Sequence, residues 1–159
     1  MSNYRFAEVA HFAMGLAPVA NGFAGAVGSD VVNMQNYGKT VFVVVTGVGL
    51  AGTATFQVEA CDDVVPTNHT PVDFHARTYA DTDVPGAVAG VVAATGLTNV
   101  AGSNRIHVIE VDAEALIALG RQYVRLLSTE VVANAVLGGI LIIQLDPKST
   151  ENTGQTSLV

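Results

Sequence analysis

Residues 106–127 read IHVIEVDAEALIALGRQYVRLL, and this pattern predicts a strand, a short helix and a second strand. β-branched residues dominate its first six positions, which favours an extended backbone. Asp112 offers a side-chain oxygen to the free N–H groups of a helix start, and Glu114 adds negative charge to the first turn. Gly120 suits the left-handed residue that ends a helix. We expect this helix to close one open end of a β-structure.

Strand patterns recur on both sides of this segment. Residues 40–46, TVFVVVT, are almost all β-branched or aromatic and predict a central strand. Residues 53–61 alternate between apolar and polar side chains, so we expect them to form a hairpin with residues 40–46 that has one solvated face. Other expected strands cover residues 9–16, 30–34, 72–79, a weak stretch near 87–93, and 136–145.

Several connections also have local signals. Residues 36–38 predict a turn, and residues 62–71 predict a loop because they contain two prolines. Gly138 and Gly139 indicate a bulge or a close backbone approach in the last strand. For residues 9–16 a helix stays open as an alternative, because Phe6, Val9 and Ala13 also share a helical face.

These elements predict a mainly β fold, either a β-sandwich or a jelly-roll-like barrel, with one short helix. We expect residues 1–147 to form a single β-domain with an N-terminal arm at residues 1–5, and residues 148–159 to form a flexible polar tail. Residues 81–104 are rich in Gly and Ala and should form a long loop, a feature that tends to be functional or mobile.

Composition limits the class of protein. Hydrophobic residues make up 50% of the 159 residues and charged residues only 13%, which argues against disorder. The net charge of −7 argues against direct nucleic-acid binding, which depends on cationic side chains. No apolar run reaches the ~20 residues of a membrane-spanning helix, and the apolar stretch 12–28 does not read as a cleaved signal.

Few residues suggest chemistry. His69, Asp73 and His75 lie close together in sequence and could ligate a metal, but solvated polar side chains are the favoured interpretation. Asp62 and Asp63 lack the spacing of a calcium loop and indicate a turn.

The other reactive residues also have structural interpretations. Glu110, Asp112 and Glu114 could act as acid and base, yet Asp112 already has a role as a helix cap. The single cysteine, Cys61, fits a small buried strand residue, and the sequon at Asn68 arises often by chance. We therefore assign no catalytic, cofactor-binding or metal residue, and expect a protein that is not an enzyme.

Three segments together resemble a group of small virion proteins of tailed bacteriophages. They are DVVNMQNYGKTVFVVVTG at residues 30–47, TATFQVEACDD at residues 53–63, and VIEVDAEAL at residues 108–116 followed by QYVRL at residues 122–126. In that group a similar V-I-E-V-D-A-x-x-L … Y-V-R stretch closes the β-domain. The resemblance implies a sandwich or jelly-roll subunit placed on the phage head as an auxiliary, decoration or cement protein.

The expected function is accordingly a capsid decoration protein on the virion surface, made in the bacterial cytoplasm. Its expected partners are the major capsid protein and copies of itself, with a trimer favoured, and neither nucleic acid nor a membrane. The arm, the 81–104 loop and the tail would grip the lattice through many weak contacts. Two alternatives stay open: a tail-tube or head–tail connector subunit, and a carbohydrate-binding β-sandwich. The latter is disfavoured because the chain has no Trp and only 4 Tyr.

Overall fold

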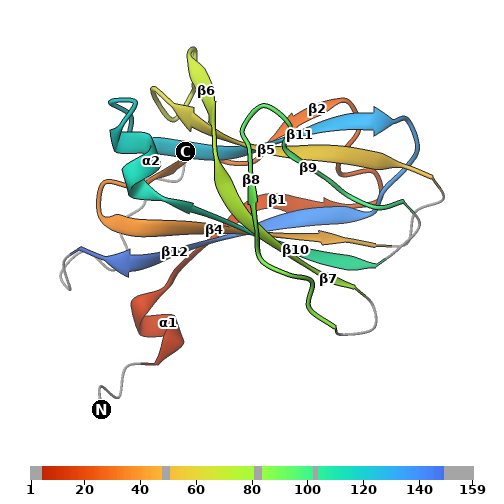
Figure 1. Ribbon diagram of the computed structural model, residues 1–159, viewed down its shortest axis with the longest axis horizontal. Coiled ribbons are helices and arrows are strands. Elements are labelled where there is room, and N and C mark those ends of the chain that lie inside the picture. The colour runs from red at the N-terminus through yellow and green to blue at the C-terminus, as the bar shows by residue number, and fades with distance from the viewer. Residues whose placement is uncertain (1–4, 48–50, 81–83, 102–103, 149–159) are drawn as a thin grey trace.

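The strand–helix–strand segment forms β10 (Arg105–Asp112), α2 (Ala113–Ile117) and β11 (Tyr123–Val132) in the computed structural model. The structure describes residues 5–47, 51–80, 84–101 and 104–148. As expected, Gly120 takes the left-handed conformation, with φ of 67°. Leu116 and Ala113 are buried, so α2 covers core residues at one end of the strands (Figure 1).

Two antiparallel sheets form the body of the molecule (Figure 1). We name them after their central strands. The β4 sheet has the order β1 (His11–Val19), β12 (Gly138–Pro147), β4 (Tyr37–Thr46), β10, β7 (Phe74–Ala80), β8 (Ala89–Val91). The β5 sheet has the order β2 (Ala26–Gly28), β11, β5 (Thr53–Cys61), β6 (His69–Val72), with β3 (Val32–Asn33) on β11 and β9 (Leu97–Thr98) on β5.

The strand order is that of a jelly roll. Strand β1 pairs with β12, β2 with β11, β4 with β10 and β5 with β6, all antiparallel. In this nested pattern, each early strand pairs with a late one, as in one long hairpin. In a jelly roll that hairpin is rolled up into two facing sheets. The expected sandwich or jelly roll is therefore confirmed, as two sheets and not a closed barrel within the described ranges. A second short helix, α1 (Phe6–Val9), joins the one that was expected.

The inner faces of the two sheets share one hydrophobic core. Alternation along each strand sends every second side chain inward, as at Phe42 in β4 and Phe56 in β5, both 0% exposed. Phe56 meets Phe23 edge to face, with ring centroids 5.3 Å apart. Each such buried side chain contributes roughly 1.5–3 kcal/mol through removal of apolar surface from water.

The predicted hairpin of residues 40–46 with 53–61 is wrong. Strand β4 pairs with β12 and β10, whereas β5 pairs with β11, β6 and β9 in the other sheet. The jelly-roll path sends these two consecutive strands to opposite sheets. The alternation within residues 53–61 is nevertheless as expected, because Ala54, Phe56, Val58 and Ala60 are all buried.

Other boundaries also differ from expectation. The 36–38 turn is replaced by a turn at Gln35 and Asn36, and Tyr37 already begins β4. The loop expected at residues 62–71 ends earlier, because His69 starts the edge strand β6, where Pro71 is tolerated. The weak strand near residues 87–93 is present as β8, and β9 was not foreseen.

The Asp112 side chain does not cap α2, contrary to expectation. It makes no capping hydrogen bond in the described structure, and its Oδ1 lies 3.8 Å from Nζ of Lys39 instead. The reason is that β10 continues through Asp112, whose side chain follows the alternation outward.

Both ends of the chain are described only in part. Residues 1–4 of the predicted arm and residues 149–159 of the predicted tail lie outside the described residues. Arg5 precedes α1, where its backbone N–H donates to Glu8 Oε2 at 3.0 Å. Lys148 is held in place, because its N–H donates to the carbonyl of Asn36 at 2.9 Å. Lys148, the first residue of the predicted tail, is thus in contact with the turn at Asn36.

The close backbone approach predicted at Gly138 is confirmed and gives a stability prediction. A Cβ at Gly138 would lie 2.3 Å from Cε2 of Phe23 and 2.8 Å from the carbonyl oxygen of Val45. Gly138→Ala should therefore lower the free energy of unfolding by about 1–3 kcal/mol, the usual cost of overpacking. Gly90→Ala is the matched control, because a Cβ there meets nothing within 4 Å. Urea denaturation of both variants measures the effect, and equal stability would contradict it.

His107 gives a pH prediction. It is 1% exposed, and burial lowers its pKa to about 4 from the usual 6.5. The unfolded chain therefore binds a proton between pH 6.5 and 4 that the folded chain does not. As the pH is lowered through this window, the free energy of unfolding decreases by up to about 1.4 kcal/mol per pH unit. Denaturation from pH 7.5 to 4.5 should show a shallower loss for His107→Gln than for wild type. The exposed control His75→Gln should keep the wild-type slope, and parallel curves for all three proteins would refute the assignment.

Candidate functional site

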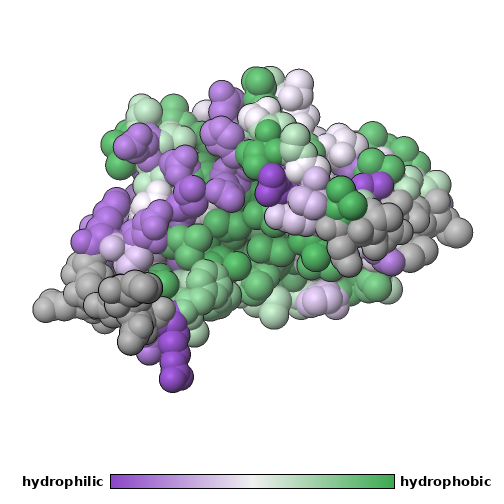
Figure 2. All heavy atoms as spheres, turned by 60° about the horizontal axis from the view of Figure 1, so that its bottom comes forward, coloured by the Kyte–Doolittle hydropathy of each residue, from purple (hydrophilic) through white to green (hydrophobic). Residues whose placement is uncertain are grey.

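The outward face of the β4 sheet is the most unusual surface of the molecule. Strand register places apolar side chains outward on four neighbouring strands, β1, β12, β4 and β10. Figure 2 shows this face as a continuous hydrophobic area. Its outward residues are Phe12, Met14, Val41, Val43, Val45, Ile106, Val108, Leu141 and Ile143, of which Val41 is buried. One face of an antiparallel sheet is commonly solvated and polar, so a face of this composition requires an explanation.

Charge on the same face is low and lies to one side. Register places Lys39, Arg77, Glu110 and Asp112 outward, and the exposed Asp146 of β12 acts on Lys39 from the same end. Nζ of Lys39 lies 3.1 Å from Oε2 of Glu110, and this hydrogen bond raises the pKa of the Lys39 ammonium. Two cations and three anions sum to −1, whereas the whole chain carries −7.

A hollow opens at one end of this face. Its volume is about 420 Å³, and the lining is apolar: Met14, Leu16, Pro18, Val45, Gly47, Leu137, Gly138, Gly139, Ile140 and Leu141. Two causes produce it. Gly139, the outward one of the two glycines, brings no side chain, and the register of β1 against β12 shifts between Met14 and Val19, which bends β1. We call this feature the glycine hollow.

A projection stands at the other end of the face. Helix α1 protrudes from the β4 sheet (Figure 1), and Phe6 on it packs edge to face on Phe12, with centroids 5.6 Å apart. Phe6 remains 58% exposed and Phe12 42% exposed. Two large aromatic side chains are thus held together in solvent, and we call them the aromatic knob.

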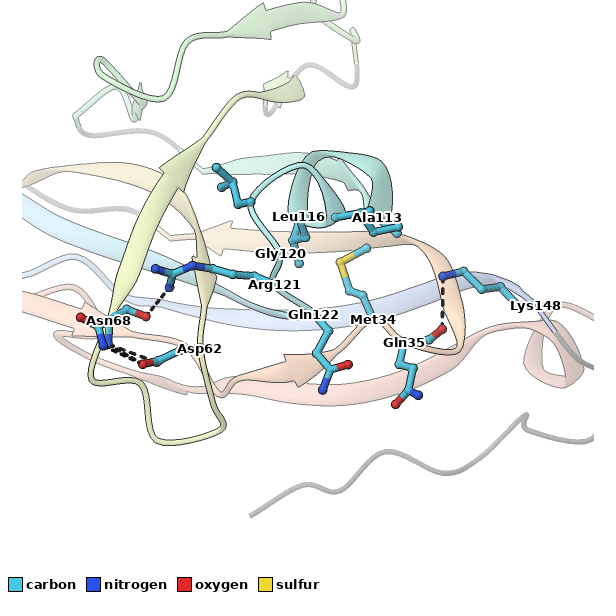
Figure 3. A pocket seen from close by; sticks show the side chains of 12 residues that line it. Met34, Gln35, Asp62, Asn68, Ala113, Leu116, Gly120, Arg121, Gln122 and Lys148 are labelled. Carbon is cyan, nitrogen blue, oxygen red and sulfur yellow. Dashed lines mark hydrogen bonds between the residues drawn. The ribbon is translucent and has the colours of Figure 1, made fainter.

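A second cavity lies beneath α2 (Figure 3). It has a volume of about 680 Å³, and Met34 and Leu116 form part of its wall. Its polar side chains mainly serve the fold. Arg121 donates to the carbonyl oxygens of Ala60 and Asn68, and Lys148 donates to that of Gln35 at 3.2 Å. This cavity therefore lacks a convergent set of uncommitted polar groups.

The expected turn at Asp62 is present. Its carboxylate accepts hydrogen bonds from Thr67 and Asn68, and those from Asn68 contribute most to a lowered pKa. Asp63 Oδ1 accepts from the N–H of Val64 at 2.7 Å. Both carboxylates thus order the 62–68 loop, in agreement with the interpretation as a turn.

The candidate metal residues do not converge. His69 lies on β6 in one sheet and His75 on β7 in the other, because the chain crosses between the sheets at Asp73. Oδ1 of Asp73 accepts a hydrogen bond from the N–H of Ala93 at 2.7 Å. Within the described ranges there is no group of three or more His, Cys, Asp or Glu side chains that could hold a metal.

The candidate acid–base residues share one depression of about 510 Å³. Glu110, Asp112 and Glu114 line it together with Asp73 and His75, a grouping that the sequence did not indicate. Glu110 and Asp112 both face Lys39. Asp73 accepts a hydrogen bond from the backbone N–H of Ala93. Three of these carboxylates are thus already engaged with partners within the chain.

A buried charge network was missed by the sequence interpretation. The Glu59 side chain is 3% exposed, and its two oxygens lie 2.8 Å from Nε of Arg125 and 2.8 Å from Nδ1 of His69. Cys61 pairs with His69 across β5 and β6. Burial raises the pKa of the Cys61 thiol to about 11, so it is not an activated nucleophile and fits the expected buried strand residue.

Glu59 should contribute strongly to stability. Glu59→Gln removes the charge that faces the guanidinium of Arg125, and breaking such a buried pair costs about 3 kcal/mol. Glu110→Gln is the control, because its pair with Lys39 is 42% and 31% exposed and should contribute less than about 1 kcal/mol. Urea unfolding at pH 7 gives both values. A loss for Glu59→Gln no larger than that for Glu110→Gln would show the network to be unimportant.

No helix in the described part of the chain is long and apolar enough to cross a membrane. Comparisons of the chain with family models, curated proteins and solved structures find no match. A function therefore has to be argued from the surface and its chemistry, since a jelly roll by itself supports many functions.

Proposed function

We propose that this protein is a non-enzymatic structural subunit of a tailed-bacteriophage virion, a decoration or cement protein that stabilises the head. The observation that carries the proposal is the apolar outward face of the β4 sheet, with its glycine hollow and aromatic knob. Permanent assemblies bury apolar faces of this kind, whereas the surfaces of monomers seldom expose them.

Two further observations support this role. The strand order is a jelly roll, an architecture used by viral capsid domains as well as by lectins, so this support is an analogy between folds. The segments at residues 30–47, 53–63, 108–116 and 122–126 that resemble small phage virion proteins form β3, β4, β5, most of β10, most of α2 and the start of β11. They therefore include the strand at the centre of the apolar face.

The proposed partners are copies of the chain, with a trimer favoured, and the major capsid protein at the virion surface. The acidic net charge disfavours direct contact with nucleic acid.

Two alternatives use the same observations differently. A tail-tube or connector subunit would also bury an apolar sheet face between ring neighbours. A carbohydrate-binding module would use the jelly roll as lectins do, but Tyr37, a potential sugar platform, is 1% exposed.

The proposal predicts that the purified chain binds phage heads that lack their accessory proteins. Bound subunits should co-sediment with the heads and raise the midpoint of thermal disruption by several degrees, because binding to the intact state shifts the equilibrium toward it. Differential scanning calorimetry with and without the chain measures the shift, and bovine serum albumin serves as the protein control. Heads that neither bind the chain nor gain stability would exclude the cement role. Rings or tubes of the isolated chain in negative stain would favour the tail alternative.

A further inference from the structure

We infer that the apolar face of the β4 sheet is the contact between copies of this chain, with the aromatic knob of one copy seated in the glycine hollow of the next. The inference rests on the proposed role as an assembling subunit and specifies the surface and the partner. The partner is a second copy of this chain.

The size of the face fits an interface between subunits. Six large apolar residues on the face, the knob and the hollow are 42–58% exposed: Phe6, Phe12, Met14, Val45, Ile106 and Leu137. A half-exposed side chain of this size leaves on the order of 100 Å² open to solvent, so these six leave roughly 600 Å². The partly exposed residues between them bring the area near the ~800 Å² per partner of a stable interface.

Charge favours a second copy over a charged partner. A protein that carries −7 repels its own copies at most orientations, but the two cations and three anions of this face sum to only −1. Two copies can thus meet here with least repulsion, while their acidic charge stays on the outer surfaces. Lys39 and Glu110 already neutralise each other within one chain, so the apolar strands at the centre need no ionic partner.

The shape of the face is complementary to itself. Phe12 is opposite Ile143 on β12, and the stretch of residues 137–141 that lines the hollow has Gly139 at its middle, four residues away and therefore about 13 Å along the strand. A two-fold axis that crosses β12 at Leu141, midway between them, would place the knob of each copy over the hollow of the other. A three-fold ring would instead need a heterologous contact, in which each copy gives its knob to one neighbour and its hollow to the other.

The first test is the association state of the full chain without phage heads. Sedimentation equilibrium at tens of micromolar should show an oligomer. Val45→Asp puts a charge in the wall of the hollow and should weaken association at least 100-fold. Val131→Asp is the matched control on β11 of the other sheet, where the residue is 58% exposed, and should associate as wild type does. A monomeric wild type, or equal effects of the two substitutions in chains with native circular dichroism, would overturn the inference.

The second test concerns the knob and the hollow. A chain with both Phe12→Cys and Val45→Cys should form disulfide-linked oligomers on mild oxidation, because these positions would meet only between copies. Each single substitution, and the pair Phe12→Cys with Val131→Cys, should not. Absence of the cross-link, or equal cross-linking of the control pair, would overturn the knob-in-hollow contact. A chain that stays monomeric but still stabilises heads would refute this inference and leave the proposed function standing.

Discussion

Strand β4 is apolar on both of its faces, and much of the structure follows from this constraint. Phe42 and Val44 point inward and are fully buried by the core between the sheets. Val43 and Val45 point outward, where the chain itself covers them only in part. A two-sided apolar strand is characteristic of a sheet covered on both faces. One layer of that cover is the β5 sheet, and the other, in our proposal, is a second copy of the chain.

The glycines of β12 connect the fold to this surface. Gly138 has no side chain because the ring of Phe23, a core residue, occupies the space where a Cβ would lie. A Cβ at Gly139 would lie 3.0 Å from the carbonyl oxygen of Leu16 and from Pro18 on the bent strand β1. Gly138 thus makes room for a core side chain, and its neighbour Gly139 lines the hollow on the outer face. One pair of residues thus serves the interior and the exterior of the sheet.

The sequence predicts features that depend on neighbouring residues and fails where distant segments meet. The β-branched run at residues 40–46 and the stop at Gly120 are local signals, and both are confirmed. Whether β4 pairs with β5 or with β12 depends on the path of the whole chain, and the hairpin prediction was wrong for this reason. The contact of Glu59 with Arg125 joins residues 66 positions apart, so only the register of β5 against β11 could have revealed it.

The pairing of the first long strand with the last has a consequence for biosynthesis. Strand β12 is inserted between β1 and β4, so the β4 sheet stays incomplete until residues 138–147 have left the ribosome. Until then, β1 and the edge of β4 lack their neighbour, and apolar strand edges of this kind promote misassembly. Contacts between such distant segments also slow folding. The nascent chain therefore exposes these apolar strand edges during the interval in which its final strand is still being made.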